Sequence, residues 1–242
     1  MVSKNQKKLI KSLYQKKYRK QHGLFVAEGK KVINELLSAG LRVEAIYTLD
    51  QAYFSINQSC MFSVSEEELK SISFLTTPQA ALAIFYIPKI DQDQSSGITV
   101  VLDDVRDPGN LGTIIRLCDW FGVDNLVCSE QTVDCYNPKV VQATMGSIAR
   151  VRIAYIDLEE YLGSQKEETP IYGTFMDGNN IHNEKLPKNG VVIMGNEANG
   201  ISSSVEKFIT GRIAVPRFGK IRKTESLNVA TATAIILNEF MR

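Results

Sequence analysis

The sequence predicts an α/β protein with a mainly parallel sheet in its C-terminal part and a smaller α/β domain ahead of it. Behind residue 97, short and nearly continuous apolar strands alternate with helical segments, which is typical of a parallel sheet covered by helices on both faces. The polar run DQDQSSG, residues 91–97, lacks periodicity and predicts a linker. We therefore expect two domains, residues 1–90 and 98–242, in this chain of 242 residues.

Each expected element has a local signal. Apolar segments in the N-terminal domain predict strands at 24–27, 43–48 and 80–87. A helix over 30–39 should end at Gly40, and Ser65 should begin a shorter helix because Ser65 and Glu68 have the spacing of a capping box. In the C-terminal domain we expect strands at 98–103, 125–128, 151–155, 171–175, 191–194 and 212–215.

Composition excludes several classes of protein. Hydrophobic residues make up 44% of the chain and charged residues 23%, which fits an ordinary globular protein. No apolar run approaches the roughly 20 residues of a membrane span, and the charged N-terminus lacks the apolar core of a secretory signal. The cysteines have irregular spacing, so we expect a cytoplasmic protein with buried free thiols at Cys60, Cys118, Cys128 and Cys135.

Basic residues are concentrated at the N-terminus. Residues 1–31 contain ten Lys and Arg residues and one acid, Glu28, a formal charge of +9, so the rest of the chain carries −8 for the net charge of +1. Tyr14, Tyr18 and His22 are interleaved with these cations as candidate stacking surfaces. A solvated basic helix is the alternative, but a second basic cluster at 217–223 favours nucleic acid as the partner.

Common cofactor and metal fingerprints are missing from the sequence. It contains no Gly-x-Gly-x-x-Gly after a strand, no P-loop and no Gly-x-Ser-x-Gly. Its two histidines, His22 and His182, lie outside any cluster with metal-ligand spacing, so we expect no metal. What remains are strand-to-helix turns that suit a ligand held mainly by main chain.

The first of these turns lies in VLDDVRDPGNLGTIIRLCDWFG, residues 101–122. Asn110 is well placed to be the N-cap of the following helix. Arg116 lies in an apolar stretch, so it should pair with a carboxylate or face an anion. A plain cap and an internal salt bridge are the structural alternatives for these two residues.

The second turn follows the apolar strand of VVIMGNEANGIS, residues 191–202. Gly195 would allow a ligand to approach the backbone closely. Glu197 would be an unpaired acid at the binding edge of the sheet, and Arg116 is its natural partner. An ordinary turn is the alternative.

The third turn lies in IAVPRFGKIRKTESLNVATATAIILNE, residues 213–239. Ser226 is the obvious N-cap of a long helix whose first turns consist of small residues, so a capped core helix is the structural alternative to a binding site. The preceding loop, residues 217–225, is unusually long and basic.

The three motifs together closely resemble those of the SpoU (TrmH-type) family of RNA ribose 2′-O-methyltransferases, in the SPOUT superfamily of S-adenosylmethionine-dependent enzymes. The resemblance places Asn110, Arg116, Glu197, Ser226 and Asn228 in the catalytic site. It places Gly195, Val215 and Leu227 in the cofactor pocket. Residues 137–151 resemble a helix of the same family, although Gln142 stands where Arg is common.

The resemblance also implies architecture and partners. Residues 14–37 resemble the ribosomal-protein-like α/β domain of rRNA-modifying members, so we expect the N-terminal domain to bind RNA through Lys16, Lys17, Arg19 and Lys20. The family further implies a deep trefoil knot in the C-terminal domain and a homodimer. The N-terminal domain favours rRNA over tRNA as the substrate. A non-catalytic RNA-binding protein on the same scaffold is the alternative from another class.

The resemblance assigns Arg116 to activation of the ribose hydroxyl. Because arginine is effectively always protonated, it is a poor general base. We therefore expect Arg116 to grip a phosphate or the developing alkoxide, while the proton leaves to a substrate phosphate or to water.

Overall fold

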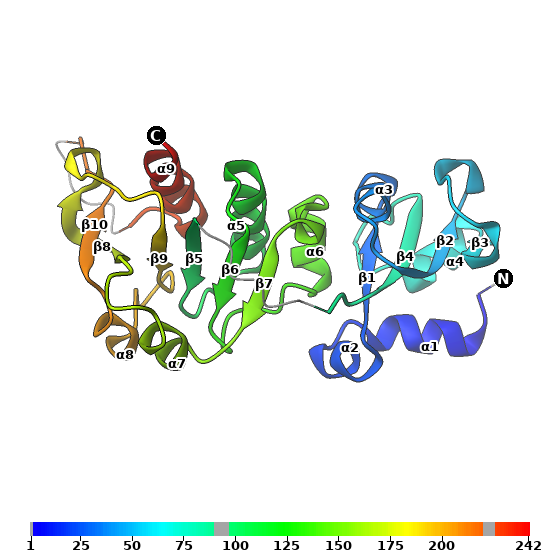
Figure 1. The fold of residues 1–242 in the computed structure, drawn as a ribbon. Coiled ribbons are helices and arrows are strands. Elements are labelled where there is room, and N and C mark those ends of the chain that lie inside the picture. The colour runs from blue at the N-terminus through cyan, green and yellow to red at the C-terminus, as the bar shows by residue number, and fades with distance from the viewer. Residues whose placement is uncertain (1, 90–96, 220–225) are drawn as a thin grey trace. The chain divides into compact units, whose positions relative to one another are not determined.

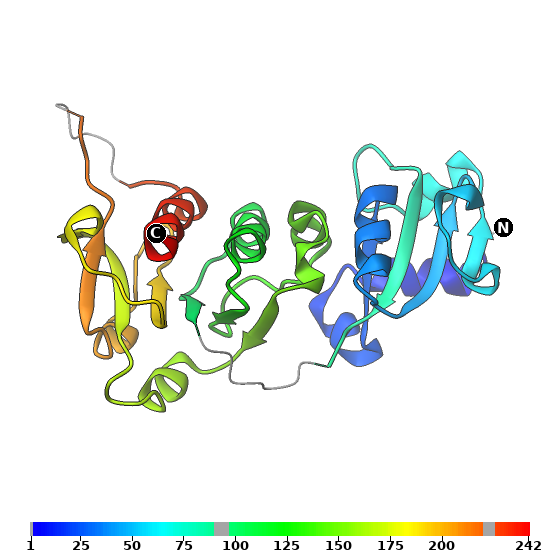
Figure 2. The same cartoon turned by 45° about the horizontal axis from the view of Figure 1, so that its top comes forward.

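The computed structural model describes residues 2–89, 97–219 and 226–242. It divides into two compact units, one formed by residues 1–89 with 134–149 and the other by residues 90–133 with 150–242. Figures 1 and 2 show the elements of both units. Segment 134–149 thus packs with the N-terminal unit, although it falls inside the expected range 98–242; the division at the linker stays a prediction. Most of the expected linker lies outside the described residues.

The N-terminal unit contains a four-stranded sheet in the order β1-β4-β2-β3. Its strands are β1 (Leu24–Glu28), β2 (Val43–Thr48), β3 (Met61–Ser63) and β4 (Ala81–Tyr86). Its helices are α1 (Lys4–Ser12), α2 (Lys16–His22), α3 (Lys30–Ser38), α4 (Glu66–Ile72) and α6 (Pro138–Thr144), with short 3₁₀ turns at Gln51–Tyr53, Gln58–Cys60 and Ser147–Ala149. The expected strands are confirmed, as is the capping box at Ser65 and Glu68. Strand β3 was not expected.

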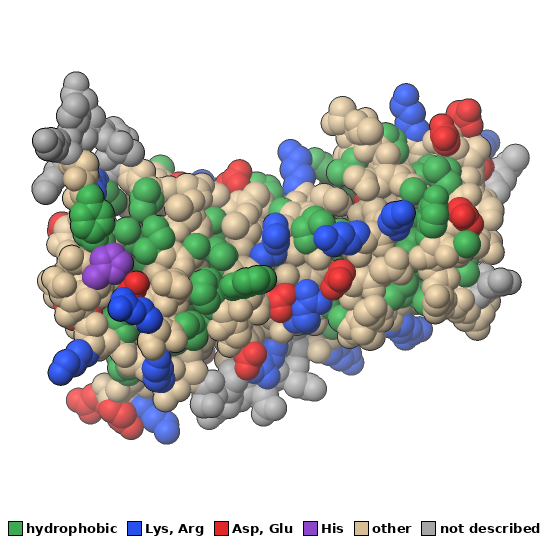
Figure 3. Space-filling view, turned by 90° about the horizontal axis from the view of Figure 1, so that it is seen from above, with side chains coloured by type: hydrophobic (Ala, Val, Ile, Leu, Met, Phe, Trp, Pro, Cys, Tyr) green, Lys and Arg blue, Asp and Glu red, His purple; other side chains and the backbone are tan. Residues whose placement is uncertain are grey.

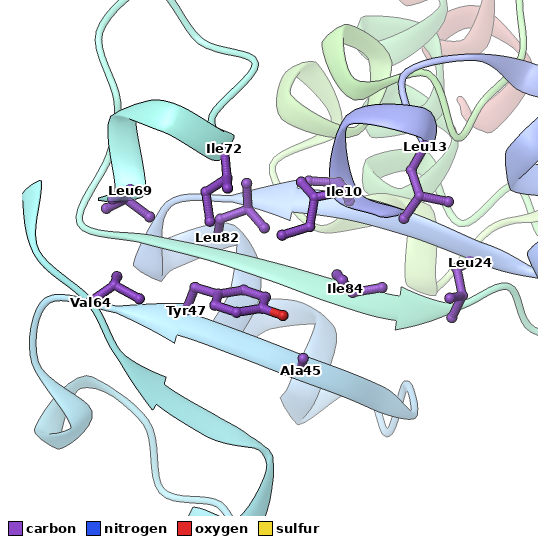
Figure 4. Packing of buried hydrophobic residues seen from close by; sticks show 11 residues of the cluster. Ile10, Leu13, Leu24, Ala45, Tyr47, Val64, Leu69, Ile72, Leu82 and Ile84 are labelled. Carbon is purple, nitrogen blue, oxygen red and sulfur yellow. The ribbon is translucent and has the colours of Figure 1, made fainter. Parts of the chain in front are cut away.

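One face of this sheet is covered by α1 and α4. Ile10 of α1 and Ile72 of α4 are fully buried against strand residues such as Tyr47, Leu82 and Ile84 (Figure 4). Full burial of each aliphatic side chain of this kind contributes about 1.5–3 kcal/mol. These contacts explain why the apolar residues of α1 lie on the face toward the sheet, while its lysines lie on the exposed face.

Arg19 of α2 is buried, and its guanidinium is bonded inside the unit. Its Nη1 donates to the carbonyl oxygens of Leu13 and Tyr14, at 2.8 Å each. Its Nε and Nη2 donate to one carboxylate oxygen of Asp134, with the Nε bond at 3.0 Å. The expectation that Arg19 contacts RNA is therefore wrong for this structure, because only 3% of the side chain is exposed.

The C-terminal unit contains a six-stranded sheet in the order β10-β8-β9-β5-β6-β7, and every pair of neighbours is parallel. Its strands are β5 (Ile98–Leu102), β6 (Asn125–Cys128), β7 (Arg152–Tyr155), β8 (Ile171–Asn180), β9 (Gly190–Met194) and β10 (Gly211–Ala214). Its helices are α5 (Pro108–Phe121), α7 (Leu158–Gly163), α8 (Ser203–Glu206) and α9 (Val229–Met241), with a 3₁₀ turn at Ile181–Asn183. All six expected strands are present, and β8 is longer than expected.

Helices cover both faces of this sheet. Apolar residues of α7 and α8 pack with one face, through Leu158, Leu162 and Val205. Helices α5 and α9 pack against each other, and both lie on the same side of the sheet in Figures 1 and 2. The sandwich explains why the strands are apolar on both sides.

Strand β8 contains a wide bulge opposite β10. Arg212 pairs with Gly173, but the next residue, Ile213, pairs with Asn179. Residues 174–178 therefore have no backbone pair on β10. Gly178 is required at the end of the bulge, because a Cβ there would lie 2.6 Å from the backbone carbon of Ile213.

We predict that Arg19→Met destabilises the protein by about 3 kcal/mol, because it leaves a mostly buried carboxylate without its cation. Thermal or urea unfolding of the full chain measures this. Lys20→Met, at an exposed position of the same helix, is the matched control. Equal midpoints for the two variants would show that the Arg19–Asp134 pair contributes nothing to folding.

Candidate active site

A cavity of about 710 Å³ lies in the C-terminal unit, among the segments that follow its parallel strands. It is lined by residues 174–176, 194–201, 213–217 and 226–227, together with Val229, Ala232 and Ile236 of α9. The cavity thus combines the β8 bulge with the second and third motifs. The carboxyl ends of strands in an open α/β sheet are the usual place for a ligand.

The three residues expected to bind a cofactor all line this cavity: Gly195, Val215 and Leu227. Leu227 is half exposed at 47%. Glycine was expected at position 195 to let a ligand approach the backbone. In the structure it is needed because a Cβ there would lie 2.3 Å from the backbone carbon of Gly200. The glycine lets the loop fold back on itself.

The loop of the second motif is held by Asn196, a residue not singled out from the sequence. Its side-chain oxygen accepts from the amides of Ala198 and Asn199, at 2.9 and 3.0 Å. Its Nδ2 donates to the carbonyl of Asp104 in the first motif, at 2.7 Å. The sequence offered one signal for this role. Asn196 lies in a turn, where an asparagine side chain often accepts a hydrogen bond from the backbone two residues further on.

A chain of hydrogen bonds joins the three motifs. Asn228 Nδ2 donates to Asn110 Oδ1 at 2.8 Å, and Asn110 Nδ2 donates to Glu197 Oε1 at 2.8 Å. The donor and acceptor ends of both amides follow from this network. Three of the five expected catalytic residues are therefore in direct contact.

The helix caps differ from the expected ones. The N-cap of α5 is Asp107, whose carboxylate accepts from the amide of Asn110 at 2.8 Å. The N-cap of α9 is Asn228, whose Oδ1 accepts from Ala230 and Thr231 at 3.0 and 3.2 Å. The expected caps at Asn110 and Ser226 are wrong. Because Asp107 caps α5, the side chain of Asn110 is left to bond across to the other motifs.

Arg116 and Ser226 lie outside the hydrogen-bonded chain. Arg116 is exposed on α5, and within the described part of the chain it makes no hydrogen bond or ion pair. The expected pairing with Glu197 is therefore wrong, because Glu197 accepts from Asn110 instead. Ser226 lines the cavity and is exposed.

Arg212 holds the β8 bulge from outside. Its guanidinium carbon lies 3.5 Å from the ring centroid of Phe175, and its Nη2 lies 3.0 Å from the Asp177 carboxylate. A third contact reaches Glu206 of α8. Arg212 donates hydrogen bonds to Asp177 and to Glu206, and these bonds, with Asp177 contributing more, raise the pKa of its guanidinium. The cavity wall at 174–176 is thereby fixed to the edge strand.

Comparisons with known proteins identify two family domains in the chain. Residues 97–238 match the SpoU rRNA Methylase family, and residues 4–83 match the MRM3-like substrate binding domain. The chain belongs to the SpoU rRNA methylase family. The resemblance seen in the sequence motifs is thus confirmed.

The similarity to individual members of the SpoU rRNA methylase family extends over nearly the whole chain. The chain is 30% identical to the 23S rRNA (guanosine(2553)-2′-O)-methyltransferase RlmP of Bacillus subtilis (strain 168), covering 97% of this chain and 96% of that protein. Its fold matches that of a TrmH family protein from Porphyromonas gingivalis, with a TM-score of 0.90, 36% identity and coverage of 99% and 98%. An AdoMet-bound rRNA methyltransferase from Sinorhizobium meliloti matches with a TM-score of 0.86, 28% identity and coverage of 99% and 96%.

The residues that the structure describes offer neither a membrane-spanning helix nor a metal-binding cluster. No helix there has the length and apolar character to cross a membrane. No group of three or more His, Cys, Asp or Glu side chains there is arranged to hold a metal ion.

We predict that Asn228→Asp lowers the methylation rate by roughly 10- to 100-fold while leaving stability nearly unchanged. The carboxylate keeps the cap on α9 but cannot donate to Asn110, so the chain to Glu197 is broken. Initial rates and unfolding midpoints measure the two effects. Asn137→Asp is the matched control, because Asn137 is also an N-cap, accepting from Lys139 at 3.0 Å. A rate loss no larger than that of the control would contradict a catalytic role for the chain.

Proposed function

We propose that this protein transfers a methyl group from S-adenosylmethionine to a ribose 2′-hydroxyl in structured RNA, with rRNA favoured over tRNA. The observation that carries the proposal is the hydrogen-bonded chain Glu197–Asn110–Asn228, which draws all three motifs of a SpoU enzyme to one edge of the sheet. The Bacillus subtilis relative, which the chain matches from end to end, is named for 2′-O-methylation of 23S rRNA.

The cavity fits S-adenosylmethionine in size and chemistry. Its volume of about 710 Å³ lies in the range of roughly 300–1,000 Å³ of small-molecule sites. Apolar side chains such as Ile213, Leu227 and Ile236 can cover the adenine ring, while Thr174 and Ser226 offer polar contacts. We assign Gly195, Val215 and Leu227 to cofactor binding.

The bound cofactor supplies an electrophilic methyl group on a sulfonium. The protein then has to orient the ribose, exclude water and stabilise the oxygen as it loses its proton. Asn110 holds the Glu197 carboxylate in one orientation, and Asn228 holds Asn110. We assign Asn110, Glu197, Ser226 and Asn228 to this task.

Arg116 suits a phosphate clamp. It is exposed, and within the described part of the chain no carboxylate pairs with it. A planar guanidinium in this state can form two parallel bonds to phosphate oxygens. We propose that Arg116 grips a substrate phosphate or the developing alkoxide, and that the proton leaves to a phosphate or to water.

We propose that residues 1–90 bind the RNA and residues 98–242 hold the catalytic site. Lys16, Lys17 and Lys20 of α2 are exposed, and Lys17 lies 4.7 Å from the ring centroid of Tyr18. We assign these three lysines to phosphate contacts. Arg19 is not assigned to RNA binding, because it is buried.

We further propose a homodimer with a trefoil knot in the C-terminal unit, acting in the cytoplasm. Family membership supports the knot and the dimer. Hydrophobic side chains reach the surface on the face shown in Figure 3. Trp120 of α5 is 84% exposed, and tryptophan is among the residues enriched at subunit interfaces. Light scattering tests the dimer against a monomer of 27.0 kDa.

We predict that the protein binds S-adenosylhomocysteine and that Ala232→Phe weakens this binding by roughly 10-fold or more, at least ~1.4 kcal/mol. Ala232 lines the cavity from α9, so a phenyl ring there occupies the ligand's volume. Calorimetry of the purified protein measures the affinity. Thr231→Phe, exposed on the same helix and outside the cavity lining, is the control. If titrating the ligand into the wild-type protein released no more heat than diluting it into buffer, the non-catalytic alternative would be favoured.

We predict that cells lacking this gene lose a 2′-O-methyl group from rRNA, and that Arg116→Lys cannot restore it. Lysine keeps the charge but loses the planar fork, so turnover should fall roughly 100-fold or more while cofactor affinity survives. Mass-spectrometric mapping of ribose methylation in rRNA and tRNA measures the modification. Arg106→Lys is the control, because Arg106 is an exposed arginine of the same motif paired with Asp104. A methyl group lost from tRNA instead would move the substrate to that class, and near-normal turnover with Arg116→Lys would refute the clamp.

A further inference from the structure

Tyr14 presents an aromatic ring on the surface of the N-terminal unit. It lies in the turn between α1 and α2, and 52% of the residue is exposed. Its ring makes an edge contact with Phe74, with centroids 5.3 Å apart and an interplanar angle of 61°. One side of Tyr14 is therefore supported by protein while the rest is open to a ligand.

The turn that carries Tyr14 is fixed from inside. Arg19 Nη1 donates to the carbonyls of Leu13 and Tyr14, and the guanidinium is anchored on Asp134. The amide of Gln15 also donates to the carbonyl of Ser12 at 3.0 Å. A ring held on a rigid turn loses little conformational entropy when it binds a partner.

Lys11 and the buried acid Glu28 both lie beside Phe74, the residue that supports Tyr14, and Glu28 accepts from the Phe74 amide at 2.8 Å. Lys11 Nζ donates to the carbonyl of Ser73 at 2.9 Å and lies 5.4 Å from the centroid of Phe74. The segment 1–27 contains no acidic residue. Its other lysines on α1 and α2 are Lys4, Lys7, Lys8, Lys16, Lys17 and Lys20. An aromatic ring on the turn between two lysine-bearing helices matches an unpaired base with phosphates on either side.

A second exposed aromatic of the same unit lacks these features. Phe62 of β3 is 38% exposed and is stacked on Tyr47, with centroids 5.3 Å apart. It contacts no cation among the described residues. Phe62 therefore serves as an internal reference for an exposed ring without a cationic setting.

We propose that Tyr14, supported by Phe74 and flanked by Lys11, is a stacking site for an unpaired nucleobase of the RNA substrate. The proposal rests on the proposed RNA-binding role of the N-terminal unit and adds a mode of recognition to it. The lysines contribute charge attraction to any RNA, whereas Tyr14 selects single-stranded or bulged nucleotides, because a base inside a duplex offers no free face.

The test is fluorescence anisotropy of the full-length protein with a labelled single-stranded RNA of about 12 nucleotides and with a duplex of the same sequence. Tyr14→Ala should weaken single-strand binding about 5- to 100-fold. Tyr14→Phe should retain the affinity, because it keeps the ring. Duplex binding should change little in either variant. Phe62→Ala is the matched control and should match wild type.

Salt dependence separates stacking from charge. Tyr14→Ala should leave the slope of log affinity against log salt unchanged, whereas Lys16→Gln combined with Lys17→Gln and Lys20→Gln should reduce it. Wild-type affinity retained by Tyr14→Ala would overturn the stacking site, as would equal losses on duplex and single strand. Equally effective competition by poly-glutamate would assign the surface to an acidic protein. Failure of the wild-type protein to bind either RNA would instead refute the RNA-binding role of the unit.

Discussion

The chain of hydrogen bonds from Asn228 through Asn110 to Glu197 is the constraint on which the candidate site depends. Each asparagine amide has one donor and one acceptor end, so the chain has a single direction. It begins at the amides of the first turn of α9, which carry partial positive charge, and ends at a carboxylate. Each bond therefore polarises the next in the same sense. Three loops far apart in sequence are thereby held in one arrangement.

That arrangement is possible because the strands ahead of the three loops are parallel. Strands β5 and β9 are neighbours, with Leu102 opposite Met194, so the first and second motifs leave the sheet side by side. The third motif leaves from β10 at the sheet's edge and returns to the other two through the N-terminus of α9, which packs on α5. The parallel sheet brings the three loops to one edge, and the hydrogen bonds of Asn110 and Asn228 fix how the loops are oriented there.

The strands were predictable because each is a short apolar run with clear ends. The caps were not, because Asp107 and Asn110, or Ser226 and Asn228, are equally good caps in isolation, and only the fold decides which is used. Arg116 was misjudged for a related reason. Its sequence neighbours are apolar, but the helical period directs Ile114 and Ile115 inward and Arg116 outward. Glu197 instead accepts a hydrogen bond from Asn110.

Arg19 shows the limit of reading charge from sequence. It stands in a run of cations, and nothing local distinguishes it from Lys17 or Lys20. Its partner Asp134 is 115 residues away, so only the folded unit reveals the pair. Arg19 is the buried cation among these three α2 residues and stabilises the fold, whereas Lys17 and Lys20 are exposed.

The β8 bulge has a consequence for how this site can vary. Residues 174–178 are skipped by β10, whereas Gly173 and Asn179 keep their pairs on either side. The length and composition of the cavity wall are therefore uncoupled from the register of the sheet. Residues can change within the bulge, up to the close approach at Gly178, without shifting a strand pair. The residues of the bulge that line the cavity can therefore vary without changing a backbone pair, except where Arg212 of β10 contacts Phe175 and Asp177.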